Sequence, residues 1–271
     1  MIKLNGNEVK FGRFPDGTSY FVMDDPGYAD ITWLYESDAE MTTLYFLVSH
    51  LKTFDIDRIV LSLPYVPNAR QDRIHNENEC FTLKHFCKFI NSLQFTEVHI
   101  FDPHSYVCQA LLDRVHVIQP KDDIQRILRF LPKNIILFYP DDGAHKKYND
   151  MLQLPAAFGI KHRNWEDGKI TSYQVAGEAK HMIAGHPVLI IDDICSRGGT
   201  FYHAAKALKE LGATDIFLYV SHCENSILLP NFNGQSLVDI PNLITEVYTS
   251  NDIFTGNHPK IKIIRDYGRE F

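Results

Sequence analysis

A chain of 271 residues can bury a substantial hydrophobic core, and 45% hydrophobic with 23% charged residues excludes a disordered or fibrous protein. The net charge of −7 and the pI near 6.0 argue against a general nucleic-acid binder, whose binding domain is basic. An anionic ligand must therefore be held by a local cluster of bases or by a metal ion.

We expect neither a signal peptide nor a membrane-spanning segment. The first residues, MIKLNGNEVKFGRF, contain no apolar signal-peptide core, and the longest apolar runs are far too short to span a bilayer. The cysteines are odd in number and form no CxxC pair: Cys80, Cys87, Cys108, Cys195 and Cys223. We therefore expect reduced thiols in a cytoplasmic protein that binds neither membrane nor nucleic acid.

Short apolar runs alternate with segments of helical period along the chain. Strands are predicted at 58–65, 98–101, 134–139, 187–191 and 216–220, and helices at 80–93 and from about 201 to 210. Such alternation predicts an α/β fold with mostly parallel sheets flanked by helices. Because the pattern occurs twice, we expect two domains, 1–130 and 131–271.

The segment VLIIDDICSRGGT, at 188–200, carries the clearest chemistry. Glycines let backbone N–H groups approach a phosphate, and the N-terminus of the following helix adds positive charge there. Thr200 can cap that helix and donate its hydroxyl to a ligand. Asp192 and Asp193, expected at the strand end, can hold ribose hydroxyls or waters of a magnesium ion. A generic strand–loop–helix turn is the alternative interpretation.

This segment resembles the phosphoribosyl-diphosphate loop shared by type I phosphoribosyltransferases and ribose-phosphate diphosphokinases, the PRPP synthetases. Further segments, in the order in which the diphosphokinases have them, resemble that family: FPDG at 14–17, PYVPNARQDR at 64–73, IFDPH at 100–104, FYPDDGA at 138–144 and IKHR at 160–163. The resemblance implies two similar phosphoribosyltransferase-like domains and an oligomer, at least a dimer, of identical chains. It also implies transfer of the β,γ-diphosphate of ATP, with Mg²⁺, to the anomeric hydroxyl of a ribose 5-phosphate compound.

The resemblance assigns a role to each motif. The catalytic pair would be Lys161 and Arg163, at the start of a flexible loop. The residues near ATP would be Phe14, Asp16, Arg70, Gln71, Asp72 and His104, with His104 and Asp141 as metal ligands. Ribose phosphate would be bound by Asp192, Asp193, Ser196, Arg197, Gly198, Gly199 and Thr200. Read without the family, Lys161 and Arg163 are an exposed basic pair, His104 a structural histidine, and Asp141 part of an Asx turn.

Three departures from the family pattern bear on specificity. Ser196 and Arg197 stand where the family's loop has Asp and Thr, Thr18 replaces an acidic residue after FPDG, and the chain is short. A guanidinium in a loop that closes on one phosphate is suited to further phosphate. The acceptor is therefore either ribose 5-phosphate or ADP-ribose, which a divergent phage branch of the family uses in rebuilding NAD.

Two other classes of function remain open. A type I phosphoribosyltransferase would use the same phosphate loop but would consume the diphosphate. A non-catalytic regulatory subunit or ligand sensor of the family would be expected to lose the cations at Lys161 and Arg163, which are present here.

Overall fold

The computed structural model describes residues 1–74, 76–163 and 170–269, with only the backbone described at 162, 163, 170 and 171. The chain divides into two compact units, Met1–Gln119 and Pro120–Phe271. The sequence placed the division after residue 130. Helix α4 (Lys121–Leu128) accounts for the difference, because it buries Ile124 and Ile127 in the core of the second unit.

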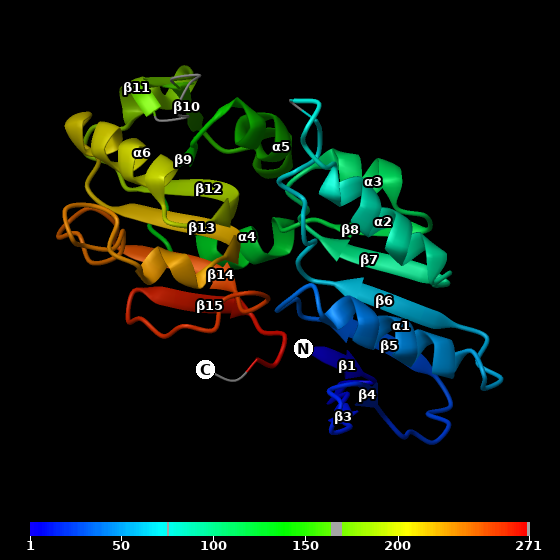
Figure 1. The fold of residues 1–271 in the computed structure, drawn as a ribbon. Coiled ribbons are helices and arrows are strands. Elements are labelled where there is room, and N and C mark those ends of the chain that lie inside the picture. Colours follow the sequence, from blue (N-terminus) through cyan, green and yellow to red (C-terminus); the bar gives the residue numbers. More distant parts are fainter. Residues whose placement is uncertain (75, 164–169, 270–271) are drawn as a thin grey trace. The chain divides into compact units, whose positions relative to one another are not determined.

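The first unit contains a six-stranded sheet in the order β2-β1-β5-β6-β7-β8 and a separate hairpin, β3-β4 (Figure 1). Its elements are β1 (Ile2–Leu4), β2 (Asn7–Glu8), β3 (Gly12–Arg13), β4 (Ser19–Tyr20), β5 (Ala29–Trp33), α1 (Glu40–Leu51), β6 (Ile59–Leu63), α2 (Thr82–Ser92), β7 (Glu97–Phe101), α3 (Tyr106–Leu111) and β8 (Val115–Ile118). The strands from β5 to β8 are parallel and adjacent in chain order. Right-handed crossovers between such strands place all three helices on one face, and one hydrophobic cluster joins those helices to the sheet.

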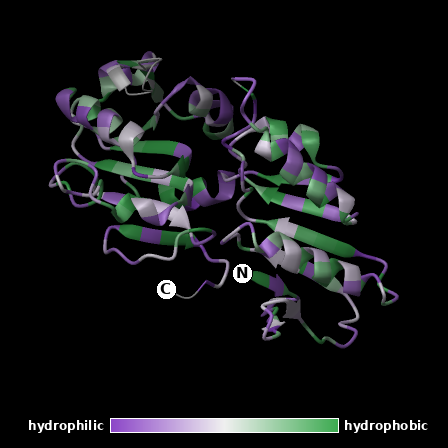
Figure 2. Cartoon of the chain, viewed as in Figure 1, coloured by the Kyte–Doolittle hydropathy of each residue, from purple (hydrophilic) through white to green (hydrophobic). Residues whose placement is uncertain are grey.

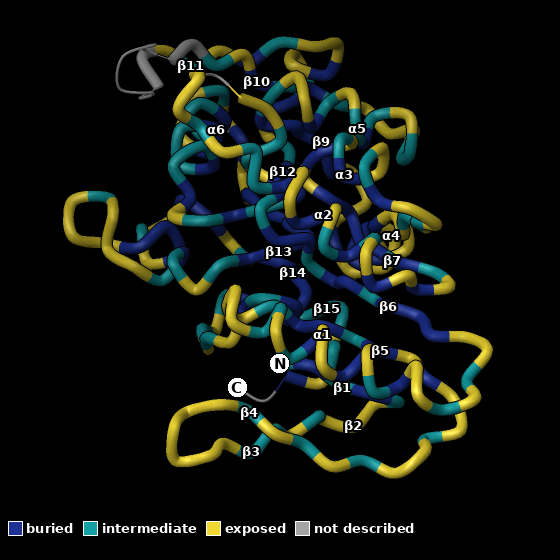
Figure 3. The backbone as a smooth tube through the Cα atoms, turned by 45° about the vertical axis from the view of Figure 1, so that its right-hand side comes forward, coloured by how far each residue is buried: buried dark blue, intermediate teal, exposed yellow. Residues whose placement is uncertain are grey.

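The second unit contains a seven-stranded sheet in the order β11-β10-β9-β12-β13-β14-β15. Its further elements are β9 (Ile136–Tyr139), α5 (Asp142–Leu152), β10 (Ala156–Arg163), β11 (Ile170–Ala176), η1 (Glu178–Met182), β12 (Val188–Cys195), α6 (Gly199–Glu210), β13 (Ile216–Cys223), η2 (Asn225–Leu228), β14 (Glu246–Ser250) and β15 (Ile261–Arg265). Two hydrophobic clusters cover this sheet, one containing α6 residues and the other α4 and α5 residues. The central strands are therefore buried on both faces, and most of their length is apolar in Figure 2. Strands β9 and β13 are buried throughout, whereas β12 is partly exposed near its carboxyl end (Figure 3).

The predicted alternation of strands and helices is confirmed in both units. Helix α2 and strands β6, β7, β9, β12 and β13 lie within or overlap the ranges predicted for them. Strand β12 is longer than predicted, since it continues through Asp192 and Asp193 to Cys195. All five cysteines are free thiols, as expected. None of the helices in the described part of the chain is long and apolar enough to cross a membrane.

Candidate active site

Acidic side chains gather at the carboxyl edge of the second unit's sheet. Strands β9 and β12 are parallel neighbours, so the residues at their carboxyl ends meet at the same edge. Asp141 follows β9 and caps α5, its Oδ1 accepting a hydrogen bond from the Ala144 N–H at 2.9 Å. Asp192 and Asp193 lie in the last part of β12. These three carboxylates therefore lie at one edge of the sheet.

Lys161 forms an ion pair with Asp141. Lys161 lies on β10, the strand next to β9. Its Nζ donates a hydrogen bond to Oδ2 of Asp141, and both side chains are about one-quarter exposed. Burial pushes the pKa of Asp141 up, but the hydrogen bonds from Lys161 and Ala144 and the lysine charge outweigh it and hold that pKa below its usual value. A cation and a carboxylate are thus placed at one point of the sheet edge, and Lys161 belongs to a strand and not to a loop.

Arg163, the other member of the expected catalytic pair, ends strand β10 at its pairing with Ile170. Its side chain lies outside the described part of the structure, as does the whole of the expected flexible loop, 164–169. The prediction for Arg163 therefore stays a prediction.

Asp193 is paired with a residue that no motif indicated. Lys147 Nζ, from α5, lies 3.0 Å from Asp193 Oδ2, and both side chains are more than nine-tenths buried. In the sequence, Lys147 follows Lys146, whose side chain is 73% exposed and pairs with Asp142 four residues earlier. Helical periodicity alone could have suggested that the two lysines face opposite ways, but not that one of them meets β12.

Asp192 lies in an unfavourable electrostatic position. Burial, together with the charges of Asp193 and Asp141, raises the pKa of Asp192 well above its ordinary value. The N–H of Asp193 donates a hydrogen bond to Asp192 Oδ1 at 2.9 Å, which lowers that pKa but does not outweigh the other effects. A cation, or hydroxyl groups that donate hydrogen bonds, would relieve this repulsion.

The predicted phosphate loop joins β12 to α6. Gly198 has a φ of +81° and precedes the first helical residue, Gly199. A Cβ at Gly198 would lie 2.6 Å from Leu237 Cδ2, whereas one at Gly199 would meet no atom within 4 Å. Leu237 is fully buried, so the segment that contains it packs closely against the phosphate loop.

The helix cap differs from the prediction. Gly198, and not Thr200, occupies the N-cap position, and no side chain caps the helix; Thr200 lies within its first turn. The free N–H groups there are suited to an anion. Ser196 Oγ lies 3.1 Å from Ser226 Oγ, while Arg197 is exposed. The loop thus offers backbone donors and an outward arginine.

Tyr173 is a second residue that sequence reasoning missed. Its hydroxyl donates to the Pro140 carbonyl at 2.9 Å, beside the start of the Asp141 turn. A Cβ at Gly159 would lie 2.1 Å from this hydroxyl, so glycine is required for the tyrosine to reach Pro140. Burial, and then the charges of Asp141 and Asp192, raise its pKa far above the usual value and keep it a neutral donor.

In the first unit, the expected ATP residues occupy the carboxyl ends of β6 and β7. Asp72 accepts from Arg73 Nε at 2.8 Å and from Ser105 Oγ at 2.7 Å. The hydrogen bond from Arg73 lowers the pKa of Asp72, and the hydrogen bond from Ser105 and the nearby charge of His104 act in the same direction. These effects outweigh partial burial, which raises the pKa. The structure thus brings Asp72 near His104 and keeps the carboxylate ionised.

The other expected ATP residues differ in their exposure and in their hydrogen bonds. Arg70 and His104 are exposed. Gln71 is tied to the N-terminus of α2, since its Oε1 accepts from Thr82 Oγ1 at 2.9 Å. Asp102, just before His104, is fully buried with a φ of +38°, which turns the chain at the end of β7.

Phe14 and Asp16 lie in the β3–β4 hairpin. Phe14 is 52% exposed, and its ring centroid lies 4.7 Å from that of Tyr20. Asp16 Oδ1 accepts from both the N–H and the hydroxyl of Thr18, which lowers its pKa. Phe14 is therefore available to a ligand, whereas Asp16 stabilises its own turn.

Comparison with known proteins agrees with these features. The sequence model of the phosphoribosyl transferase domain matches residues 141–245. The ribose-phosphate pyrophosphokinase of Thermococcus kodakarensis is 27% identical over 220 residues, 79% of this chain and 77% of its own. The ribose-phosphate pyrophosphokinase of Pyrococcus abyssi is 26% identical over 82% of this chain and 79% of its own length. The ribose-phosphate pyrophosphokinase of Buchnera aphidicola is 26% identical over 92% of this chain and 80% of its own length.

The fold has a solved counterpart. The crystal structure of phosphoribosylpyrophosphate synthetase from Mycobacterium smegmatis superposes with a TM-score of 0.74 at 19% identity, covering 94% of this chain and 85% of that one. The fold of the two α/β units is thus shared with a solved phosphoribosylpyrophosphate synthetase. Over most of its length, the chain is similar in sequence to ribose-phosphate pyrophosphokinases.

Proposed function

We propose that the protein transfers the β,γ-diphosphate of ATP to the anomeric hydroxyl of a ribose 5-phosphate moiety and releases AMP. The anomeric oxygen forms a bond to the β-phosphorus as the bond from that phosphorus to the α-phosphate's bridging oxygen breaks, and the hydroxyl proton is lost to water. The observation that carries this proposal is the placement of Lys161 at Asp141, on the same sheet edge as the phosphate loop.

The phosphate loop supports binding of the acceptor. Backbone N–H groups from Ser196 to Thr200 and the N-terminus of α6 suit the 5-phosphate. Asp193 is engaged by Lys147, so Asp192 is the carboxylate better suited to accept hydrogen bonds from the ribose 2- and 3-hydroxyls. Such bonds would also relieve the repulsion that raises the pKa of Asp192. In this proposal Asp193 positions the strand end for Asp192.

The donor side of the proposal is built from the first unit. Arg70, Gln71, Asp72 and His104 would contact ATP, and Phe14 and Asp16 would approach the adenine of a neighbouring copy in a homo-oligomer. The 52% exposure of Phe14 supports its part of this arrangement, whereas the local bonds of Asp16 favour a structural role in the hairpin.

The residues present suit Mg²⁺. Asp141 and Asp192 supply oxygen donors at a place where negative charges repel one another, and oxygen is the ligand that Mg²⁺ prefers. We propose Asp141 as a protein ligand of Mg²⁺ in the second unit and His104 as a ligand of Mg²⁺ in the first. When bound, Mg²⁺ neutralises charge on the phosphate oxygens.

The transfer step needs positioning and positive charge more than covalent help from the protein. Lys161 would stabilise the charge that develops on the transferred phosphoryl oxygens, with Arg163 in the same role. Asp141 holds Lys161 in place before the substrate arrives. Loss of one such cation costs about 10²-fold or more in rate.

We infer that the acceptor is either free ribose 5-phosphate or ADP-ribose. Arg197 favours ADP-ribose, the substrate of the phage branch, because it is an exposed cation one residue before the glycines of the loop. A second phosphate attached to the 5-phosphate would extend towards such a side chain.

Product analysis tests the proposal. The protein is mixed with ATP, Mg²⁺ and either ribose 5-phosphate or ADP-ribose, and the adenine nucleotides are separated. AMP formed in step with a pyrophosphorylated sugar is the expected result. ADP would indicate a simple kinase, and no turnover with either acceptor would favour a binding protein. The more rapidly consumed acceptor identifies the substrate.

A further inference from the structure

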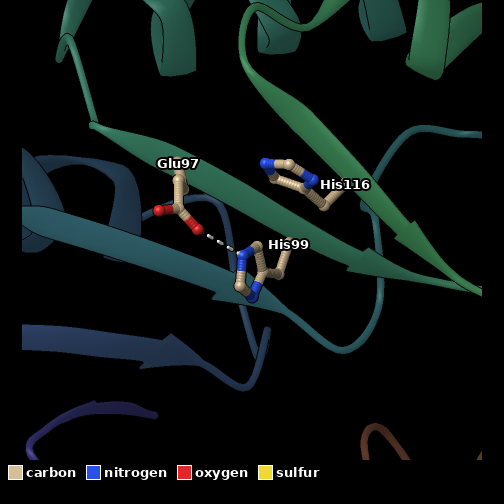
Figure 4. A group of neighbouring side chains, drawn as sticks. All are labelled: Glu97, His99 and His116. Atoms are coloured by element: carbon tan, nitrogen blue, oxygen red, sulfur yellow. Dashed lines mark hydrogen bonds and ion pairs between the residues drawn. The ribbon is translucent and has the colours of Figure 1, made fainter.

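Three potential metal ligands lie together on the sheet of the first unit, away from the residues proposed for ATP. Glu97 and His99 are two residues apart on β7 and so point to the same face of the strand. His116, on the edge strand β8, is the direct register partner of His99. Figure 4 shows the three side chains on neighbouring strands, with Glu97 and His99 joined by a hydrogen bond.

Solvent reaches all three side chains. The alternate residues Val98 and Ile100 are buried in the core, whereas Glu97 and His99 are about one-third exposed and His116 is exposed. The three helices pack against the core side of the sheet. An ion from solution can therefore reach the group and keep a water molecule as a further ligand.

The distances suit a small cation. His99 Nε2 lies 3.0 Å from Glu97 Oε2, the imidazole centroids of His99 and His116 are 5.3 Å apart, and one ligand atom from each residue lies within 4.8 Å of the others. Zinc binds nitrogen and oxygen at about 2.0–2.2 Å in tetrahedral geometry, so two of its ligand atoms lie about 3.3–3.6 Å apart. Small rotations of exposed side chains would close the difference.

Arg58 contacts the carboxylate from its other side. Its Nε and Nη2 each lie 3.1 Å from Glu97 Oε1, while Oε2 faces His99. Hydrogen bonds from His99 and then Arg58 lower the pKa of Glu97, so it is ionised. Such a partner fixes the orientation of a ligating carboxylate. Arg58 is 54% exposed, so solvent screens much of its repulsion of a cation.

We propose that Glu97, His99 and His116 form a binding site for a divalent transition-metal ion of the zinc type. Two imidazoles and one carboxylate favour such an ion over Mg²⁺, which prefers oxygen ligands. The site is independent of the proposed enzymatic function. A bound ion joins the edge strand β8 to β7 and stabilises the folded first unit by mass action.

Zinc binding is the direct test. The parent protein for this test is the full chain with the substitution Cys80→Ser, because Cys80 is an exposed thiol that could itself bind zinc. Millimolar Mg²⁺ is present to occupy oxygen-rich sites, and Zn²⁺ is titrated against a chromophoric chelator. The same titration is run on His116→Gln and Glu97→Gln, which keep the size of each side chain. His85→Ala, an exposed histidine on α2 of the same unit, is the matched control.

We expect one Zn²⁺ per chain that is lost or at least tenfold weaker in both ligand variants and unchanged in the control. Zinc should also raise the melting temperature of the parent protein but not that of His116→Gln. Equal zinc affinity in the parent and both ligand variants, or no zinc binding by the parent, would overturn the proposal and leave Glu97 and His99 as a simple hydrogen-bonded pair.

Discussion

Lys147 and Asp193 form a buried ion pair, with Nζ and Oδ2 3.0 Å apart and both side chains more than nine-tenths buried. The pair links α5 to the carboxyl end of β12, directly beside Asp192. It therefore fixes the position of the acidic strand end on which the proposed acceptor site depends.

Lys147→Met should lower the free energy of unfolding by about 3–5 kcal/mol, because it removes the lysine charge that neutralises the buried Asp193 carboxylate. Urea denaturation followed by circular dichroism measures this. Lys146→Met is the matched control on the same helix. Its pair with Asp142 is exposed, so a change of no more than about 0.5 kcal/mol is expected. Similar losses in both variants would contradict the structural role of Lys147.

Lys161→Ala should lower kcat by about 10²-fold or more while leaving the KM for ATP nearly unchanged, since its charge is needed chiefly in the transition state. Steady-state kinetics give both constants. Lys180→Ala, an exposed lysine of η1, serves as the control. Unchanged kcat in Lys161→Ala would remove this residue from the mechanism.

His104→Ala should raise the concentration of Mg²⁺ or ATP required for half-maximal activity, because a proposed metal ligand is removed. Activity is measured over a matrix of Mg²⁺ and ATP concentrations and compared with His85→Ala. If the two variants have the same metal dependence, His104 has a structural role only.

Arg197→Thr tests the choice of acceptor. Loss of one charge-assisted hydrogen bond costs about 1.5–3 kcal/mol, or roughly 10- to 150-fold. We expect kcat/KM for ADP-ribose to fall by about that factor and kcat/KM for ribose 5-phosphate to stay nearly constant. Equal losses with both acceptors, or a parent enzyme that prefers ribose 5-phosphate, would rule out the larger substrate.

Gly198→Ala should destabilise the protein by about 1–3 kcal/mol, because an L-residue is strained at a φ of +81° and its Cβ would press on Leu237. Gly199→Ala is the neighbouring control, since its Cβ meets open space and alanine favours a helix. Thermal unfolding compares the two. A Gly198→Ala protein as stable as Gly199→Ala would show that the loop adjusts without strain.

The sequence by itself determined the α/β class and the main strands. Apolar runs such as 134–139 have to be buried on both faces of a sheet, and Phe86 and Ile90 on α2 recur with helical period, so local pattern and final burial agree. The motif residues around Asp141 and Asp192 were found in the same way, because strand ends and glycine-rich turns have local signatures. The sequence did not predict the full extent of β12, which depends on pairing with β13. It also did not predict the cap at Gly198, which depends on packing against Leu237.

Only the tertiary structure decided which charges meet. Lys146 and Lys147 are adjacent residues of the same type, yet one is exposed and the other is buried against Asp193, 46 residues later. Tyr173 reaches Pro140 only because β10 and β11 bring it over Gly159. His116 faces His99 only through the register of β7 and β8. Each of these contacts joins residues distant in the chain, and the sheet order that creates them is set by burial of the whole core and not by any local pattern.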